Sequence, residues 1–191
     1  QLYYELLLRY NRRILTARDE GKLLIATGIY VPNEIIYALD IIPLHLENVP
    51  ITYAILMGEG AELLSRAKSF GLPPEVCSNH RTIAAFFLNR LAPPVDAVVW
   101  THLLCDNTAK IGELLTKLCQ VRSFFLDRPY RGGERSINYL VGELEGLVEF
   151  LESLSGKRLR PERLEAAMDC SRQMIALSQE LDSLRKESPS P

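Results

Sequence analysis

The feature that most constrains the fold is an apolar run that ends directly at a helix start. Residues 23–31, LLIATGIYV, are apolar along nearly their whole length, which is typical of a strand covered on both faces in a parallel sheet. Pro32 stops this run, and Asn33 and Glu34 follow it. Proline lacks only an N–H that is unpaired in a first helical turn, and a carboxylate favours the positive helix end. The sequence therefore predicts a strand-to-helix turn here.

The same alternation of apolar runs and helix-like segments continues along the chain. Further strands are expected over residues 41–47, 95–100 and 122–127, and Pro43 favours an edge position for the first of them. Helices are expected over residues 2–18, 32–40, 60–71, 78–92 and 107–120, whereas residues 48–59 have no firm assignment. Strand, helix and strand in succession indicate right-handed βαβ units. We therefore predict an α/β domain over residues 1–130 with a doubly wound, mainly parallel sheet of the flavodoxin or Rossmann type.

The chain changes character after residue 130. Residues 135–155 and 161–187 each keep a helical pattern, so a pair of long helices is expected in a separate segment, residues 131–191. The last four residues, Ser188-Pro189-Ser190-Pro191, have the composition of a linker.

Charge and hydropathy exclude several classes of function. The 22 Lys and Arg residues nearly balance the 24 Asp and Glu residues, so no global field attracts nucleic acid or an anionic membrane. No apolar run reaches the length of roughly 18 to 20 residues that a membrane span needs, and no signal peptide is recognisable. We expect a cytoplasmic protein, in which the four cysteines are thiols, metal ligands or core residues rather than disulfides.

Two of the four cysteines lie where chemistry is expected. Cys77 and Cys105 each precede a predicted helix, and Cys105 also follows a predicted strand, so it lies at the edge of the sheet where open α/β folds bind ligands. The positive end of a helix favours a thiolate, the form that attacks electrophiles and binds metals. Their 28-residue separation alone does not distinguish a metal site from two cysteines in helix-capping loops. Cys119 and Cys170 fall inside helices, where cysteine usually packs as a small apolar residue.

Other candidate groups remain open from the residues alone. Ser78 or Asn79, and Asp106-Asn107, are suitable helix caps. Glu34 can act as a base at the sheet edge or can simply complement its helix dipole. His80 and His102 are each a possible ligand or proton carrier, or only polar residues near an element end, and His45 has no evident partner. The chain lacks a P-loop, a G-x-G-x-x-G and a G-x-S-x-G motif, which removes the simplest nucleotide-binding and hydrolase interpretations.

Five segments, taken in order, resemble the 2-hydroxyacyl-CoA dehydratase and benzoyl-CoA reductase family, and the resemblance covers almost the entire chain. They are YVPNEIIYALDIIPL (30–44), CSNHR (77–81), DAVVW followed by Cys105-Asp106 (96–106), FFLDRP (124–129) and LSGKRLRPERL (154–164). The resemblance implies that Cys77 and Cys105 are two ligands of a 4Fe–4S cluster and that Glu34 lies in an acyl-CoA pocket. Iron–sulfur clusters are held by cysteine thiolates, which agrees with the helix-terminus argument.

The resemblance also implies a mechanism and partners. In this family an ATP-dependent iron–sulfur activator passes one electron at low potential to the cluster and then to the CoA thioester. A radical then loses the neighbouring hydroxyl, giving net loss of water, or in the reductase branch the electron enters an aromatic ring. The expected partners are the acyl-CoA substrate, a homologous second subunit and the activator, with no nucleic acid and no membrane.

The chain departs from the family pattern in two respects. Family subunits have two α/β halves and take a third cluster cysteine from the C-terminal half, and neither Cys119 nor Cys170 matches that ligand. The family often has A-A-G where this chain has Ala38-Leu39-Asp40. Three functions therefore stay open: an N-terminal half of a dehydratase-like subunit, a benzoyl-CoA reductase-type subunit, and a cluster-free structural paralogue that pairs with a full-length subunit.

Overall fold

The centre of the fold is one sheet of four parallel strands. The computed structural model describes residues 2–103 and 105–186. Its strands are β1 (Leu24–Thr27), β2 (Ile42–His45), β3 (Ala97–Trp100) and β4 (Arg122–Phe125), in the order β2-β1-β3-β4. The predicted doubly wound α/β fold is confirmed. The chain leaves β1 toward β2 and later returns to the other side of β1 with β3, so the topological switch point lies between β1 and β3.

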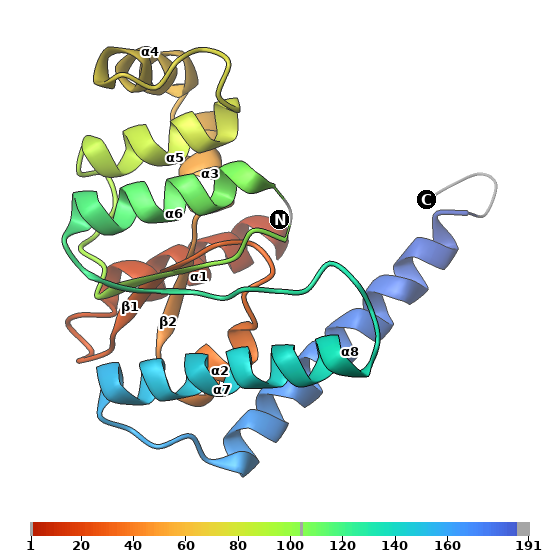
Figure 1. Cartoon of the computed structure of the whole chain (residues 1–191). Coiled ribbons are helices and arrows are strands. Elements are labelled where there is room, and N and C mark those ends of the chain that lie inside the picture. The colour runs from red at the N-terminus through yellow and green to blue at the C-terminus, as the bar shows by residue number, and fades with distance from the viewer. Residues whose placement is uncertain (1, 104, 187–191) are drawn as a thin grey trace.

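The sheet has a separate core on each face, because successive strand residues point to opposite sides. Helices α1 (Leu2–Thr16), α5 (Ser78–Leu88) and α6 (Asp106–Cys119) cover one face, and α2 (Asn33–Ala38) and α7 (Glu134–Ser155) cover the other (Figure 1). The first core includes Ile14, Leu24, Ala26, Leu44, Ile83, Val98, Trp100, Ile111 and Leu115. The second includes Ile25, Ile35, Ile36, Leu39, Ala97, Val99, Leu147 and Leu151.

A further layer lies outside α5. Helix α4 (Gly60–Phe70) packs there (Figure 1), and α3 (Val49–Leu56) contacts both α4 and α5. The three helices share a small cluster that contains Ala54, Leu63, Ala67 and Ala85. Helix α4 ends at Gly71 with φ of 107°, as the glycine in the sequence predicts. Helix α3 falls in the segment that the sequence left unassigned.

Pro43 lies in an edge strand, as predicted, and it costs the sheet no hydrogen bond. The N–H groups of Ile42 and Leu46 point toward β1, where they bond the carbonyls of Leu23 and Thr27 at 2.9 Å, so residue 43 has its nitrogen on the outer side. On that side the Tyr10 hydroxyl donates to the Pro43 carbonyl at 3.2 Å and accepts from the His45 N–H at 3.0 Å. Tyr10 of α1 therefore covers the polar edge that β2 leaves open.

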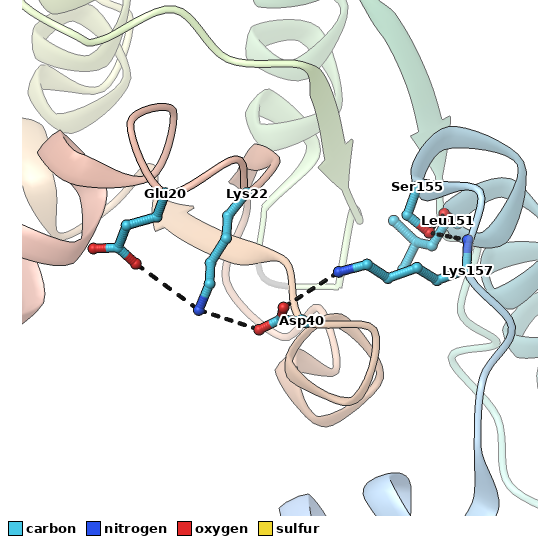
Figure 2. A network of polar contacts seen from close by, with 6 residues as sticks. All are labelled: Glu20, Lys22, Asp40, Leu151, Ser155 and Lys157. Atoms are coloured by element: carbon cyan, nitrogen blue, oxygen red, sulfur yellow. Dashed lines mark hydrogen bonds and ion pairs between the residues drawn. The ribbon is translucent and has the colours of Figure 1, made fainter.

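A small ionic network connects three turns at the amino ends of the strands. Asp40 contacts the ammonium groups of Lys22 and Lys157, each at 3.2 Å, and Lys22 also lies 3.9 Å from Glu20 (Figure 2). Asp40 adopts a positive φ of 60°, which aspartate tolerates better than most residues. This network therefore links the turn before β1, the turn before β2 and the turn after α7.

The predicted pair of long C-terminal helices is confirmed as α7 and α8 (Pro161–Leu184). Helix α7 contributes Leu147 and Leu151 to the second core, whereas α8 buries no residue completely, packs on α2 and extends away from the body (Figure 1). The proposed division near residue 130 stays a prediction, and the expected linker at residues 188–191 lies outside the described residues. Among the described helices, none is both long enough and apolar enough to cross a membrane.

Candidate functional site

The candidate site lies at the carboxyl edge of the sheet. The turn after β1 is fixed there by the Gly28 N–H, which donates to the Val99 carbonyl of β3 at 2.9 Å, and Tyr30 within this turn has a φ of 65°. The turn after β3 leads through Thr101 and His102 to Cys105. Both turns therefore flank the switch point, where open α/β sheets bind their ligands.

Cys77 and Cys105 occupy equivalent positions, because each is the N-cap residue of its helix. The Cys77 carbonyl accepts the Arg81 N–H at 3.0 Å at the start of α5, and the Cys105 carbonyl accepts the Thr108 N–H at 2.9 Å at the start of α6. Helices α5 and α6 pack against each other and begin on the same side of the molecule (Figure 1). The fold thus brings both thiols to one edge and to the positive ends of two adjacent helices.

The predicted capping residues are wrong. Ser78 and Asp106 are already the first helical residues, because the extended backbone ends one position earlier, with ψ of 130° at Cys77 and 135° at Cys105. Neither cysteine side chain makes a capping hydrogen bond. Cys77 is exposed and Cys105 is half-buried, and both are free thiols. The capping function therefore belongs to the backbone and leaves the sulfur atoms available.

Buried polar atoms without a hydrogen-bond partner gather at the same edge. Within the described residues they are Asn33 Oδ1, Asn79 Oδ1, His80 Nδ1, Thr101 Oγ1 and Thr108 Oγ1. Each of these atoms belongs to a residue in the first turn of a helix or to the first residue after a strand. Buried polar groups in native proteins almost always have a partner, so this edge has the composition of a site that water or a ligand completes.

Glu34 lies at this edge but on the other face of the sheet. It is in the first turn of α2, which packs on the second core, and it lines a cavity of about 440 Å³ between α2 and α8 together with Arg13, Tyr37 and Met174. The Arg13 guanidinium carbon lies 5.5 Å from the centre of the Tyr37 ring. The structure therefore brings Cys77 and Cys105 to one face and Glu34 to the opposite face of the same edge.

A second carboxyl group at this edge, that of Glu47, was not predicted from the sequence. It follows β2, and burial raises its pKa, an effect that hydrogen bonds from the backbone N–H groups of Ile29 and Glu47 itself only partly oppose. Glu47 lines a cavity of about 360 Å³ with Ser78 and Asn79, the two residues after Cys77. The only sequence signal was its position as the last residue of a predicted strand.

The three histidines have different environments. Burial lowers the pKa values of His45 and His80, and the Nδ1 atom of His45 lies 3.3 Å from the Thr27 hydroxyl. His102 is different, because its Nδ1 lies 3.4 Å from a carboxylate oxygen of Asp127, in the turn after β4. Of the three, His102 therefore has the surroundings of a residue that handles protons.

The two helix-interior cysteines lie apart from Cys77 and Cys105, although Cys170 lines the cavity that contains Glu34. Cys119 packs against the first core, as predicted, and burial raises the pKa of its thiol. Cys170 is exposed, so its predicted apolar packing is wrong; α8 contacts the body along one side only, and no residue of α8 is fully buried. Across residues 2–103 and 105–186, no three His, Cys, Asp or Glu side chains converge as a metal-binding group.

Comparison with known proteins identifies similar sequences over nearly the whole chain. The model of the family described as 2-hydroxyglutaryl-CoA dehydratase, D-component, matches residues 28–191. A benzoyl-CoA reductase subunit of Thauera aromatica is 27% identical, over 98% of this chain and 46% of its own length. The (R)-phenyllactyl-CoA dehydratase alpha subunit of Clostridium sporogenes is 23% identical, over 93% of this chain and 46% of its own length.

A third relative, the (R)-2-hydroxyisocaproyl-CoA dehydratase alpha subunit of Clostridioides difficile, is 24% identical over 98% of this chain and 48% of its own length. The chain spans about half the length of the curated relatives it matches. All three relatives are named as subunits, so each belongs to an enzyme with more than one kind of chain.

Proposed function

The chain belongs to the family described as 2-hydroxyglutaryl-CoA dehydratase, D-component, and from this premise we propose that it is the N-terminal half of a dehydratase-like subunit. In this proposal it contributes to the radical elimination of water from a 2-hydroxyacyl-CoA thioester. Its proposed partners are a homologous second subunit and an ATP-dependent iron–sulfur activator. The names of the relatives, each a subunit of an acyl-CoA enzyme, support the substrate class and the need for a second chain.

The observation that carries the proposal is the equivalent placement of Cys77 and Cys105. Both are N-cap residues of packed helices at the switch-point edge, and neither sulfur is used for capping. A cluster ligand must be a thiolate, and the positive ends of two helices favour negative charge at both positions. We therefore assign the two thiols as ligands of a 4Fe–4S cluster.

The residues fit this cluster as an incomplete ligand set. The described part of the chain places two thiols at the edge and no third His, Cys, Asp or Glu with them, so a further ligand has to come from outside these residues. When bound, the cluster would supply single electrons at low potential to the thioester. The neighbouring unpartnered groups, Thr101 and Thr108, are positioned to donate hydrogen bonds at this edge.

Glu34 is proposed as the residue that contacts the acyl-CoA substrate as a base. Its cavity between α2 and α8 is lined by apolar residues, Met174 and Ala167, and by the basic Arg13. An apolar pocket with a few polar groups suits an acyl chain and its carbonyl. Glu47, whose raised pKa favours a proton-holding carboxyl, is the alternative acid or base on the cysteine side.

Anaerobic reconstitution with iron and sulfide tests the cluster assignment. Iron content and the visible absorption spectrum are measured for the wild type, Cys77→Ala, Cys105→Ala and the matched control Cys170→Ala. The thiol of Cys170 is exposed on α8, which packs on α2, on the other face of the sheet from α5 and α6. We expect the first two variants to lose iron and Cys170→Ala to retain it. Equal iron uptake by all four proteins would refute the ligand assignment. No uptake by the wild type, even when it is assembled with a chain that supplies the further ligand, would favour the cluster-free structural paralogue.

A benzoyl-CoA reductase-type subunit is the second candidate. It is supported by the identity to the benzoyl-CoA reductase relative, which is 27%, against 23% and 24% for the two dehydratase relatives. Calorimetric titration with benzoyl-CoA and with a 2-hydroxyacyl-CoA separates the two candidates. Tighter binding of the aromatic thioester would favour the reductase branch.

A further inference from the structure

His102 and Asp127 are neighbours because of the strand register. Trp100 of β3 pairs with Phe125 of β4, and His102 and Asp127 each lie two positions beyond these partners. The His102 Nδ1 atom lies 3.4 Å from Asp127 Oδ1, and the His102 side chain is only 12% exposed. Two adjacent turns at the carboxyl edge therefore present an imidazole and a carboxylate to each other.

Helix α7 makes two hydrogen bonds with Asp127, one with its carboxylate and one with its backbone. The Tyr139 hydroxyl donates to Asp127 Oδ2 at 2.7 Å, and one helical turn later Glu143 Oε2 accepts the Asp127 N–H at 3.0 Å. The hydrogen bond to Asp127 raises the pKa of Tyr139 to about 12, so the tyrosine keeps its proton and remains a donor. With Oδ2 occupied by Tyr139, Oδ1 is the oxygen directed at His102.

Aromatic contacts fix the plane of the imidazole. The ring centre of His102 lies 5.6 Å from that of Phe125 and 4.8 Å from that of Tyr130. A carboxylate facing Nδ1 favours the tautomer with the proton on Nδ1 and leaves a lone pair on Nε2. In many enzymes a carboxylate that faces one ring nitrogen orients the histidine, so that the other nitrogen can transfer a proton.

We propose that His102, oriented by Asp127 and Tyr139, is an acid–base residue that moves a proton at the acyl group of a CoA thioester. This inference rests on the proposed function. Net dehydration removes a proton from one carbon and hydroxide from its neighbour. His102 Nε2 takes the proton, the imidazolium is stabilised by Asp127, and the same proton leaves with the hydroxide as water, so the residue is unchanged after a turnover.

The position of His102 explains why this role is distinct from that of Glu34. His102 lies three residues before Cys105, in the turn that leads to α6, whereas Glu34 lies on α2 across the sheet. A thioester that extends along this edge has an acid–base group available on each side. Asp127 and Tyr139 do not need to touch the substrate and are positioning residues.

The tautomer of His102 tests the positioning directly. The chain has only three histidines, so long-range proton–nitrogen NMR spectra resolve them, with His45 and His80 as internal controls. We expect the Nδ1–H tautomer for His102 in the wild type and the Nε2–H tautomer in Asp127→Asn. In that variant the amide oxygen accepts from Tyr139 and the amide NH₂ faces Nδ1, which must then accept.

Asp169→Asn on α8 is the matched control and should leave all three histidine spectra unchanged. An Nε2–H tautomer in the wild type, or no change in Asp127→Asn, would overturn the proposed pair. These spectra need no substrate, so they decide the pair even if the proposed function fails.

A second measurement tests the chemistry in the enzyme assembled with its partner subunits. We expect His102→Gln and Asp127→Asn each to lower kcat about 100-fold while acyl-CoA binding is retained. Undiminished turnover by His102→Gln would overturn the acid–base role. Absence of acyl-CoA binding by the wild type would instead refute the proposed function.

Discussion

Gly112 is a position where an added Cβ would clash with the core, and its replacement gives the sharpest stability prediction. The indole of Trp100 packs directly on α6 at this residue. A Cβ added to Gly112 would lie 2.6 Å from Trp100 Cε2 and closer still to Cδ2 and Cγ, whereas carbon atoms in contact prefer roughly 3.5–4.0 Å. Trp100 is 7% exposed and belongs to the first core, so the rigid ring has to move together with its neighbours.

The expected loss of stability follows from two opposing effects. Overpacking a well-filled core costs about 1–3 kcal/mol, and this strain acts at the centre of the ring rather than at a flexible chain end. Replacing glycine with alanine within a helix increases the free energy of unfolding by up to about 1 kcal/mol. We therefore expect Gly112→Ala to lower the free energy of unfolding by about 1–2 kcal/mol.

Gly142→Ala is the matched control, because Gly142 also lies within a helix but a Cβ there meets no atom within 4 Å. The free energy of unfolding of the control should increase by up to about 1 kcal/mol from helix propensity alone. Urea unfolding is followed by far-ultraviolet circular dichroism and by the fluorescence of the single tryptophan. With an m-value of about 2 kcal/mol/M, the midpoint of Gly112→Ala should fall by roughly 0.5–1 M and that of the control should rise.

The fluorescence of the native state gives an independent readout, since displacement of Trp100 changes its surroundings. We expect altered emission from folded Gly112→Ala and unaltered emission from folded Gly142→Ala. If Gly112→Ala were as stable as the control and kept wild-type emission, the close approach of the indole to α6 would be disproved.

Three further predictions concern polar groups. Tyr10→Phe should cost about 1–3 kcal/mol in urea unfolding, because it removes the partner of the His45 N–H and of the Pro43 carbonyl, while Tyr4→Phe, at an exposed position, should be neutral. Burial raises the pKa of Asp40, but hydrogen bonds from its two lysine partners outweigh burial and leave that pKa below the ordinary 3.8. Asp40→Asn should therefore cost at most about 1 kcal/mol at neutral pH, and this difference should disappear as the pH falls below about 4. Burial lowers the pKa of His45 from 6.5, so as the pH falls the unfolded chain binds a proton at this residue before the folded chain does. The melting temperature should therefore decrease as the pH is lowered below about 6.5, and it should decrease less in His45→Gln.

The elements of the fold were predictable where one pattern dominated. Strands β1 and β3 are buried on both faces, so they read as apolar runs, and Pro43 correctly indicated the edge. Helix α3, with the sequence VPITYAIL, was missed because it carries β-branched residues and no charged face, so its periodicity is weak. The strand order itself, with β1 beside β3, depends on pairing between distant segments and has no local signal.

The candidate site was predictable only in part, for the same reason. Cys77 and Cys105 could be placed at helix starts from local residues, but the packing of α5 on α6 that brings them to one side is a property of the tertiary fold. The partner of His102 could not be named, because Asp127 becomes its neighbour only through the register of β3 with β4. Glu47 looked like an ordinary surface glutamate until its burial was known.

The structure also separates the residues proposed for chemistry from those that hold the fold together. The two cores lie on the two faces of the sheet, whereas Cys77 is exposed and Cys105 is half-buried at the carboxyl edge, where neither sulfur makes a capping bond. Replacing either thiol with alanine therefore removes little packing, and surface changes of this kind usually alter stability by less than about 0.5 kcal/mol. A loss of iron in these variants, at unchanged unfolding free energy, would consequently report the loss of a ligand and not the loss of the fold.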